Sequence, residues 1–334
     1  MGLFDQESIV SVGKILRDKS RPLAERFRAL FTLRNVGGEL AISNIAACFD
    51  DSSALLKHEC AYCLGQMQDP SAIPLLTSVL RDTQQDVMLE LVEIVSPIQR
   101  FIQPDVLVST ANFPESACEA LGAIGRSDVL EFLKEYCNDP ATELAETCQL
   151  AVERIQWLQS KEASHQSTNC AYSSVDPAPP CEGLATEELR KVLLDETRPL
   201  FSRYRAMFAL RNRGDETSIL ALTEGLQCKS ALFRHEIAYV LGQIQHEAAV
   251  ECLQHNLSDT AENYMVRHEC AEALGSIATD ESMKSLEKYL SDEEQVVRES
   301  CEVALDMCEY ERSGQFQYAD GLNRVTEETC ASCH

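Results

Sequence analysis

The feature that most constrains this chain is that it repeats itself over almost its whole length. The stretch RPLAERFRALFTLRN at 21–35 returns as RPLFSRYRAMFALRN at 198–212. The stretch KHECAYCLGQ at 57–66 returns as RHEIAYVLGQ at 234–243, and in both pairs the residue numbers differ by 177. The chain of 334 residues therefore consists of two homologous halves. Its fold must be one that the same structural unit can build twice.

Each half is itself repetitive, with a shorter period. His235 and His268 occupy the same place in successive units, and so do Arg267 and Arg298. Apolar residues recur at helical spacing within each unit, and no alternating strand pattern is present. A period of roughly 31–33 residues indicates stacked helical hairpins. The sequence therefore predicts an all-α fold: an α-solenoid of about eight HEAT-like hairpins in two pseudo-symmetric halves.

Composition divides the two halves. Residues 160–183 are rich in Ser and Pro and lack apolar periodicity, which is typical of a linker. We therefore expect an N-terminal HEAT-like half at 1–159, a linker at 160–183, a C-terminal HEAT-like half at 184–310 and a tail at 311–334.

Charge and hydropathy exclude several classes of partner. Lys and Arg number 29 against 54 Asp and Glu, so the net charge of −25 does not suit a nucleic-acid phosphate backbone. The most apolar run, 89–108, is interrupted by charged residues and prolines and should not span a membrane. The N-terminal MGLFDQESIV has no signal-peptide core. We therefore expect a cytoplasmic monomer whose 15 cysteines are reduced.

A His-Glu dipeptide stands at the same place in three repeats: His58-Glu59, His235-Glu236 and His268-Glu269. Small residues lie three and seven positions after each histidine, for example Ala271 and Gly275 after His268. Tight helix packing alone would explain the small residues, but it would not explain an imidazole and a carboxylate together three times. Mixed imidazole and carboxylate ligands suit iron, manganese or zinc. The pattern therefore predicts a two-metal site that draws on both halves.

These motifs together resemble a known family. The stretches HECAYCLGQ, HEIAYVLGQ and VRHECAEALG, the linker YSSVDPAPP at 172–180 and the C-terminal FQYADGL at 316–322 resemble the deoxyhypusine hydroxylases over nearly the whole chain. The resemblance implies a monooxygenase with two iron ions as cofactors and O2 as co-substrate. It implies hydroxylation of deoxyhypusine, a modified lysine on the partner protein translation initiation factor 5A, which completes hypusine. It also implies metal ligands at His58, Glu59, His235, Glu236, His268 and Glu269, with no catalytic residue beyond them.

The sequence departs from the family pattern in the first half. Beyond position 117 the numbers of equivalent residues in the two halves differ by 153 and no longer by 177. An insertion of about 24 residues, which a loop can absorb, therefore lies within an unmatched segment near 89–116. The offset of 177 places Leu91 opposite His268, whereas the second offset places Glu115 there and Ser116 opposite Glu269. Neither alignment gives a His-Glu pair. Glu115 is a candidate substitute ligand, because a carboxylate can bind iron.

Two accounts of this segment stay open. Either it is part of the functional protein and the first half keeps only the pair at 58–59, or it reflects a splice variant or gene-model error. An abrupt, non-homologous insert at the edge of a motif favours the second account.

Two other functions remain as alternatives. One is an inactive or metal-deficient HEAT-repeat binding protein that has lost the second His-Glu motif. The other is a relative of the HEAT-like bilin lyases, against which the three His-Glu pairs argue. The iron content per chain distinguishes the hydroxylase from the binding protein.

Overall fold

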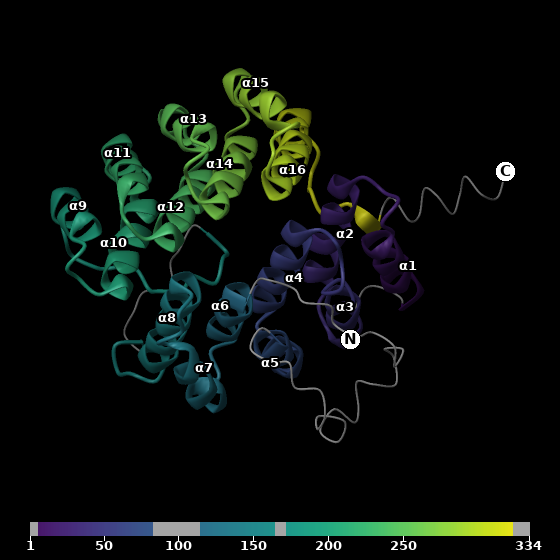
Figure 1. Cartoon of the computed structure of the whole chain (residues 1–334), viewed down its shortest axis with the longest axis horizontal. Helices are drawn as coiled ribbons and strands as arrows, with labels where there is room; N and C mark the ends of the chain where they lie inside the picture. Colours follow the sequence, from purple (N-terminus) through teal and green to yellow (C-terminus); the bar gives the residue numbers. More distant parts are fainter. Residues whose placement is uncertain (1–5, 83–113, 164–171, 323–334) are drawn as a thin grey trace. The chain divides into compact units, whose positions relative to one another are not determined.

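The structure is a computed structural model that describes residues 6–82, 114–163 and 172–322 (Figure 1). Every regular element within these ranges is a helix, so the predicted all-α fold is confirmed. The unmatched segment near 89–116 lies outside the described residues up to position 113. Among the helices of the described ranges, none has the length and apolar character needed to cross a membrane.

The chain forms two compact units, and the first of them is discontinuous in sequence. Unit 1 consists of Met1–Val129 together with Phe316–His334. Its α-helices are α1 (Gln6–Arg17), α2 (Leu23–Val36), α3 (Glu39–Ala46), α4 (Ala54–Met67), α5 (Ile73–Asp82) and α6 (Pro114–Ile124). The short 3-10 helices η1 (Pro70–Ala72) and η3 (Ser127–Val129) follow α4 and α6. Helix α4 packs against α6, and α1 packs against α2 and α3.

Unit 2 is the continuous segment Leu130–Gln315. Its first helices are α7 (Leu130–Tyr136), α8 (Thr142–Leu158), α9 (Thr186–Leu194), α10 (Leu200–Arg213) and α11 (Glu216–Glu224). The remaining α-helices are α12 (Ala231–Ile244), α13 (Val250–Ser258), α14 (Tyr264–Ile277), α15 (Asp280–Tyr289) and α16 (Gln295–Ser313), with 3-10 turns η5 (Gly225–Gln227) and η6 (Glu247–Ala249). Figure 1 shows α10, α12, α14 and α16 as one row of this unit and α11, α13 and α15 as a second row.

Packing divides the chain at a different point from the sequence repeats. The division into 1–159, a linker at 160–183, 184–310 and a tail at 311–334 stays a prediction about the repeats. In the packed molecule, α8 contacts α10 and α12 and so belongs to unit 2. A helix that the repeat pattern assigns to the first half therefore packs against the second.

The three helices that carry the His-Glu pairs begin and end in the same way. Each is 14 residues long. A side-chain oxygen accepts a hydrogen bond from a first-turn backbone N–H at each N-cap, which is Ser53, Ser230 or Asn263. Each helix then ends at a residue in the left-handed region: Gln68 (φ 51°), Gln245 (φ 55°) and Ala278 (φ 56°). These shared ends place each histidine at the fifth residue of its helix.

Three glycines bring these helices unusually close to their neighbours. A Cβ atom added at Gly65, Gly242 or Gly275 would lie 2.6, 2.9 or 2.8 Å from the Cα atom of an alanine on the next helix. The facing alanines are Ala120 on α6, Ala273 on α14 and Ala304 on α16. Only glycine fits these contacts, because unstrained carbon–carbon contacts are about 3.5–4.0 Å. We refer to these three contacts as the Gly–Ala contacts.

The Gly–Ala contacts also align the two halves. Gly65 and Gly242 stand at the offset of 177, while their partners Ala120 and Ala273 stand at the offset of 153. A pair of hydrogen bonds repeats the same correspondence: Gln68 Nε2 donates to the Ala123 carbonyl and Gln245 Nε2 donates to the Ser276 carbonyl, both at 2.9 Å. Helix α6 therefore packs on α4 as α14 packs on α12.

The C-terminal segment completes unit 1. Arg28 on α2 lies 4.4 Å from the Tyr318 ring centroid, and its Nη1 lies 3.4 Å from Asp320 Oδ2. The backbone N–H of Gly321 donates to Thr32 Oγ1 at 3.0 Å. Residues 316–322 thus cover the surface of α2.

In unit 2 the segment 172–180 docks on α10 in a similar way. The buried Arg211 on α10 donates to both oxygens of Asp176, at 2.8 and 2.6 Å. Its guanidinium also lies 4.5 Å from the Tyr172 ring centroid. The two stretches that carried the family resemblance outside the His-Glu motifs therefore dock on α2 and α10, the helices formed by the repeated stretches at 21–35 and 198–212.

Candidate metal centre

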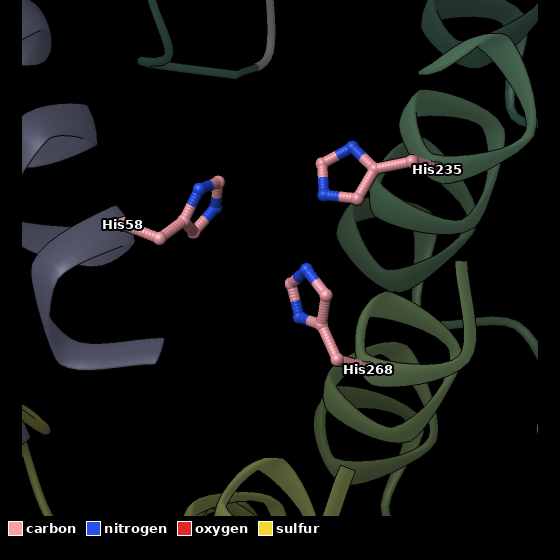
Figure 2. Close-up of side chains that lie close together, drawn as sticks. All are labelled: His58, His235 and His268. Carbon is pink, nitrogen blue, oxygen red and sulfur yellow. The ribbon is translucent and has the colours of Figure 1, made fainter. Parts of the chain in front are cut away.

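In unit 2 two histidines face a common space from neighbouring helices. His235 on α12 is 7% exposed and His268 on α14 is 4% exposed. Their ring centroids are 5.2 Å apart, with an angle of 50° between the planes. Figure 2 shows both imidazoles projecting to the same side from α12 and α14. This spacing follows from the Gly–Ala contact between the helices and from the shared position of each histidine in its helix.

Carboxylates lie beside both rings. Glu269 Oε2 lies 3.3 Å from His235 Nε2, and Glu272 Oε1 lies 3.7 Å from His268 Nδ1. Ser300 Oγ on α16 lies 3.4 Å from the same oxygen of Glu272. Two imidazoles with adjacent carboxylates are a donor set that suits iron, manganese or zinc.

Burial sets the protonation states of the side chains in this cluster. It holds the pKa of His268 well below its usual value, and the nearby His235 lowers it further. His268 is therefore neutral at neutral pH, the form in which an imidazole can bind a metal. Burial also raises the pKa of Glu272 to about 7.

Arginine side chains fix the helices next to these histidines. Arg234 precedes His235 and pairs with Glu262 at 2.5 Å, and Arg267 precedes His268 and pairs with Asp292 at 2.5 Å. Each pair joins a histidine helix to the segment that leads into the next helix of its row. Because these pairs are largely buried, they stay formed at ordinary ionic strength.

In unit 1 the corresponding histidine is His58 on α4, which is 9% exposed and is also drawn in Figure 2. Its Nδ1 lies 2.7 Å from Ser116 Oγ, in the first turn of α6. Glu59, like Glu236 and Glu269 in unit 2, is buried. Each half thus presents a buried His-Glu pair at the same helical position.

The packing shows which residues of unit 1 correspond to the pair His268-Glu269 of unit 2. Because α6 packs on α4 as α14 packs on α12, Glu115 occupies the place of His268 and Ser116 that of Glu269. The offset of 153 is therefore the structural one. Leu91, the partner given by the other offset, lies outside the described residues. That Glu115 serves as a substitute ligand stays a prediction, as do the roles of the six His and Glu residues.

Two residues that lie beside these histidines were not predicted from the sequence. Glu272 follows His268 by four positions, so helical spacing alone could have indicated it. Ser116 was known to align with Glu269, but nothing in the sequence shows that its hydroxyl reaches His58.

The likeness to known proteins covers nearly the whole chain. A model described as HEAT repeats matches residues 10–95 and 219–306, and one described as PBS lyase HEAT-like repeat matches 202–228. Deoxyhypusine hydroxylase of Bos taurus is 56% identical over 323 residues, which span 97% of this chain and 98% of the relative. The human enzyme is 54% identical over 325 residues, covering 97% of this chain and 98% of its own length. The chain belongs to the deoxyhypusine hydroxylase family.

A solved structure agrees with this assignment. The structure of human deoxyhypusine hydroxylase in complex with glycerol has a TM-score of 0.80 and 55% sequence identity to this chain. The match covers 91% of this chain and 96% of that structure. The predicted family, the HEAT-like solenoid and an enzyme of the monooxygenase class are thereby confirmed.

Proposed function

We propose that this chain hydroxylates the deoxyhypusine side chain of translation initiation factor 5A, with O2 as co-substrate, and so completes hypusine. The observation that carries the proposal is the identity of 52–56% with deoxyhypusine hydroxylases over 97% of the chain. The buried His-Glu pairs support it, because they supply ligands at the positions that the family resemblance implies.

The cofactor in this proposal is a pair of iron ions. Their proposed ligands come from His58, Glu59, His235, Glu236, His268 and Glu269. The donor chemistry fits, since His268 is held neutral and Glu269 lies beside His235. Bound iron would supply the activation of O2 that insertion of oxygen into a C–H bond requires.

The chain's own residues have three tasks in this reaction. His235 and His268 bind the metal from adjacent helices, and the contact of Gly242 with Ala273 sets the separation of these helices. Glu272 orients His268 by facing its Nδ1 edge. The net charge of −25 attracts the cationic, lysine-derived side chain and its carrier.

A metal-deficient binding protein is the second candidate, and one observation favours it. Glu115 and Ser116 occupy the places of His268 and Glu269, so unit 1 offers one His-Glu pair among its described residues. A centre with fewer imidazoles binds its ions more weakly. In this alternative the HEAT-repeat surface would bind the partner protein without oxidising it.

Iron content and product formation together test the proposal. The full chain is loaded anaerobically with Fe(II), its iron is counted, and it is given O2 and deoxyhypusine-bearing translation initiation factor 5A. We expect about two iron ions per chain and a mass increase of one oxygen atom on the substrate. One iron or none, with no change in substrate mass, would favour the binding protein.

We further propose that the chain acts as a cytoplasmic monomer on this protein substrate and has no nucleic-acid or membrane partner. Sedimentation of the purified chain tests the monomer, because a dimer would double the measured mass.

A further inference from the structure

The hydrogen bond between His58 and Ser116 distinguishes the α4–α6 contact of unit 1 from the equivalent helix contacts of unit 2. His58 Nδ1 and Ser116 Oγ are 2.7 Å apart, and the serine is only 1% exposed. A contact this short between two buried side chains fixes the rotation of the imidazole ring. It also engages one of the two nitrogens through which the ring could bind a metal.

The Gly–Ala contacts show that Ser116 occupies a recurring position. In each contact the residue four positions before the alanine faces the histidine helix: Ser116 on α6, Glu269 on α14 and Ser300 on α16. Glu269 lies beside Nε2 of His235 at 3.3 Å. Ser300 reaches Glu272 instead. Ser116 therefore takes the place of a carboxylate but contacts the opposite nitrogen of its histidine.

Which group donates in this hydrogen bond decides whether the imidazole keeps a free nitrogen for a metal. A serine oxygen can accept a hydrogen bond from Nδ1–H and still donate its own proton elsewhere. Histidines that bind metals almost always donate their second ring N–H to a neighbouring acceptor, which fixes the tautomer. If Ser116 instead donated to Nδ1, the neutral ring would carry its proton on Nε2 and could not bind through either nitrogen.

We propose that Ser116 is a positioning residue for His58: it accepts from Nδ1–H and so presents Nε2 as the metal-binding nitrogen. The role of Nε2 rests on the proposed metal-dependent function, whereas the tautomer is a property of the metal-free protein. A neutral hydroxyl here holds the ring without adding a negative charge, unlike the carboxylate of Glu269.

The tautomer can be read directly in the full-length, metal-free chain labelled with 15N-histidine. Long-range 1H–15N correlations distinguish the two neutral tautomers, and H58Q identifies the His58 signals among those of the seven histidines. We expect His58 to carry its proton on Nδ1 in the wild type and to become a mixture of tautomers in S116A. S116T, which keeps the hydroxyl, should restore the wild-type pattern.

Ser300→Ala is the matched control, because Ser300 occupies the same position on α16 but does not contact a histidine in the described structure. It should leave the His58 signals unchanged. Titration with Co(II) supplies the second readout, and S116A should weaken binding by about tenfold.

Different results would overturn the proposed role of Ser116 and the proposed function. A wild-type His58 protonated on Nε2, or an S116A variant with unchanged tautomer and unchanged Co(II) affinity, would overturn the role of Ser116. Absence of hydroxylation in a chain with the expected tautomer would instead count against the proposed function. Circular dichroism confirms that each variant is folded before either conclusion is drawn.

Discussion

Replacing Gly242 with alanine is the perturbation that most directly connects helix packing to the proposed metal centre. An alanine at Gly242 would bring its Cβ to 2.9 Å from the Cα of Ala273 and 3.1 Å from its Cβ. Relaxing these contacts to an ordinary separation of about 3.5–4.0 Å requires α12 and α14 to move apart by about 0.6–1 Å. That movement also separates His235 from His268, whose rings are now 5.2 Å apart.

Two opposing terms set the stability of G242A. Overpacking a buried contact costs about 1–3 kcal/mol. The higher helix propensity of alanine offsets about 1 kcal/mol of this. We therefore expect a net loss of about 0–2 kcal/mol, which corresponds to a fall in Tm of about 2–4 °C per kcal/mol.

Metal binding should respond more strongly than stability. Metal–ligand distances in proteins hold to within about 0.2 Å, so a shift of about 0.6 Å between two ligand helices is poorly tolerated. We expect the Co(II) affinity of G242A to fall by at least about tenfold, which is about 1.4 kcal/mol. Calorimetric unfolding and Co(II) titration measure the two effects separately.

The equivalent change in unit 1 provides an internal comparison. An alanine at Gly65 would place its Cβ 2.6 Å from the Cα of Ala120, closer than the 2.9 Å at Gly242. G65A should therefore lose more stability than G242A. If both variants kept their Tm and their Co(II) affinity, the close approach of the helices could not be what sets the ligand spacing.

Three further perturbations test other parts of the molecule. The variant E115H returns an imidazole to the place on α6 that corresponds to His268 and keeps Ser116, so it should tighten iron binding in an anaerobic Fe(II) titration; an unchanged affinity would refute the argument from ligand loss. R267A removes one partner of a largely buried ion pair and should destabilise the chain by about 3 kcal/mol in chemical unfolding, and an effect below about 0.5 kcal/mol would contradict that role. The hydrogen bond from Arg267 lowers the pKa of Asp292, so the folded state binds this proton less readily than the unfolded state. This contribution is present above the unfolded pKa of about 3.9 and is lost as pH falls through the lower folded value, so D292N should be less stable than wild type at pH 7, and the difference should shrink as pH falls from 7 to below about 3.9. A constant difference between the two across this range would show that Asp292 does not titrate in this way.

The repeat architecture was predictable because close packing of the helices requires particular residue types at fixed positions. Gly65 and Gly242 recur at the offset of 177 because a neighbouring helix passes close to each of them. The same steric requirement therefore produces both the sequence similarity and the packing. The histidines were predictable for a related reason: a dipeptide at a fixed place in a repeat acquires a fixed place on a helix.

Other features depend on contacts that no local pattern records. The unit boundary at Val129 separates α8 from its own sequence half, because α8 packs on α10 and α12. The contact of Ser116 with His58 depends on the side-chain rotamers of two residues that are distant in sequence. An alignment placed Ser116 opposite Glu269, but it could not say which atom of the imidazole the hydroxyl would meet.

The docking of residues 316–322 on α2 has a consequence for the order in which the protein folds during synthesis. Unit 2 is continuous, so all of Leu130–Gln315 has been translated before the end of unit 1 is made. Until then Arg28 lacks the carboxylate of Asp320, and Thr32 lacks the backbone N–H of Gly321. The first unit to be translated is therefore the last to be completed, and a chain that terminates at Gln315 would have a whole unit 2 and an unfinished unit 1.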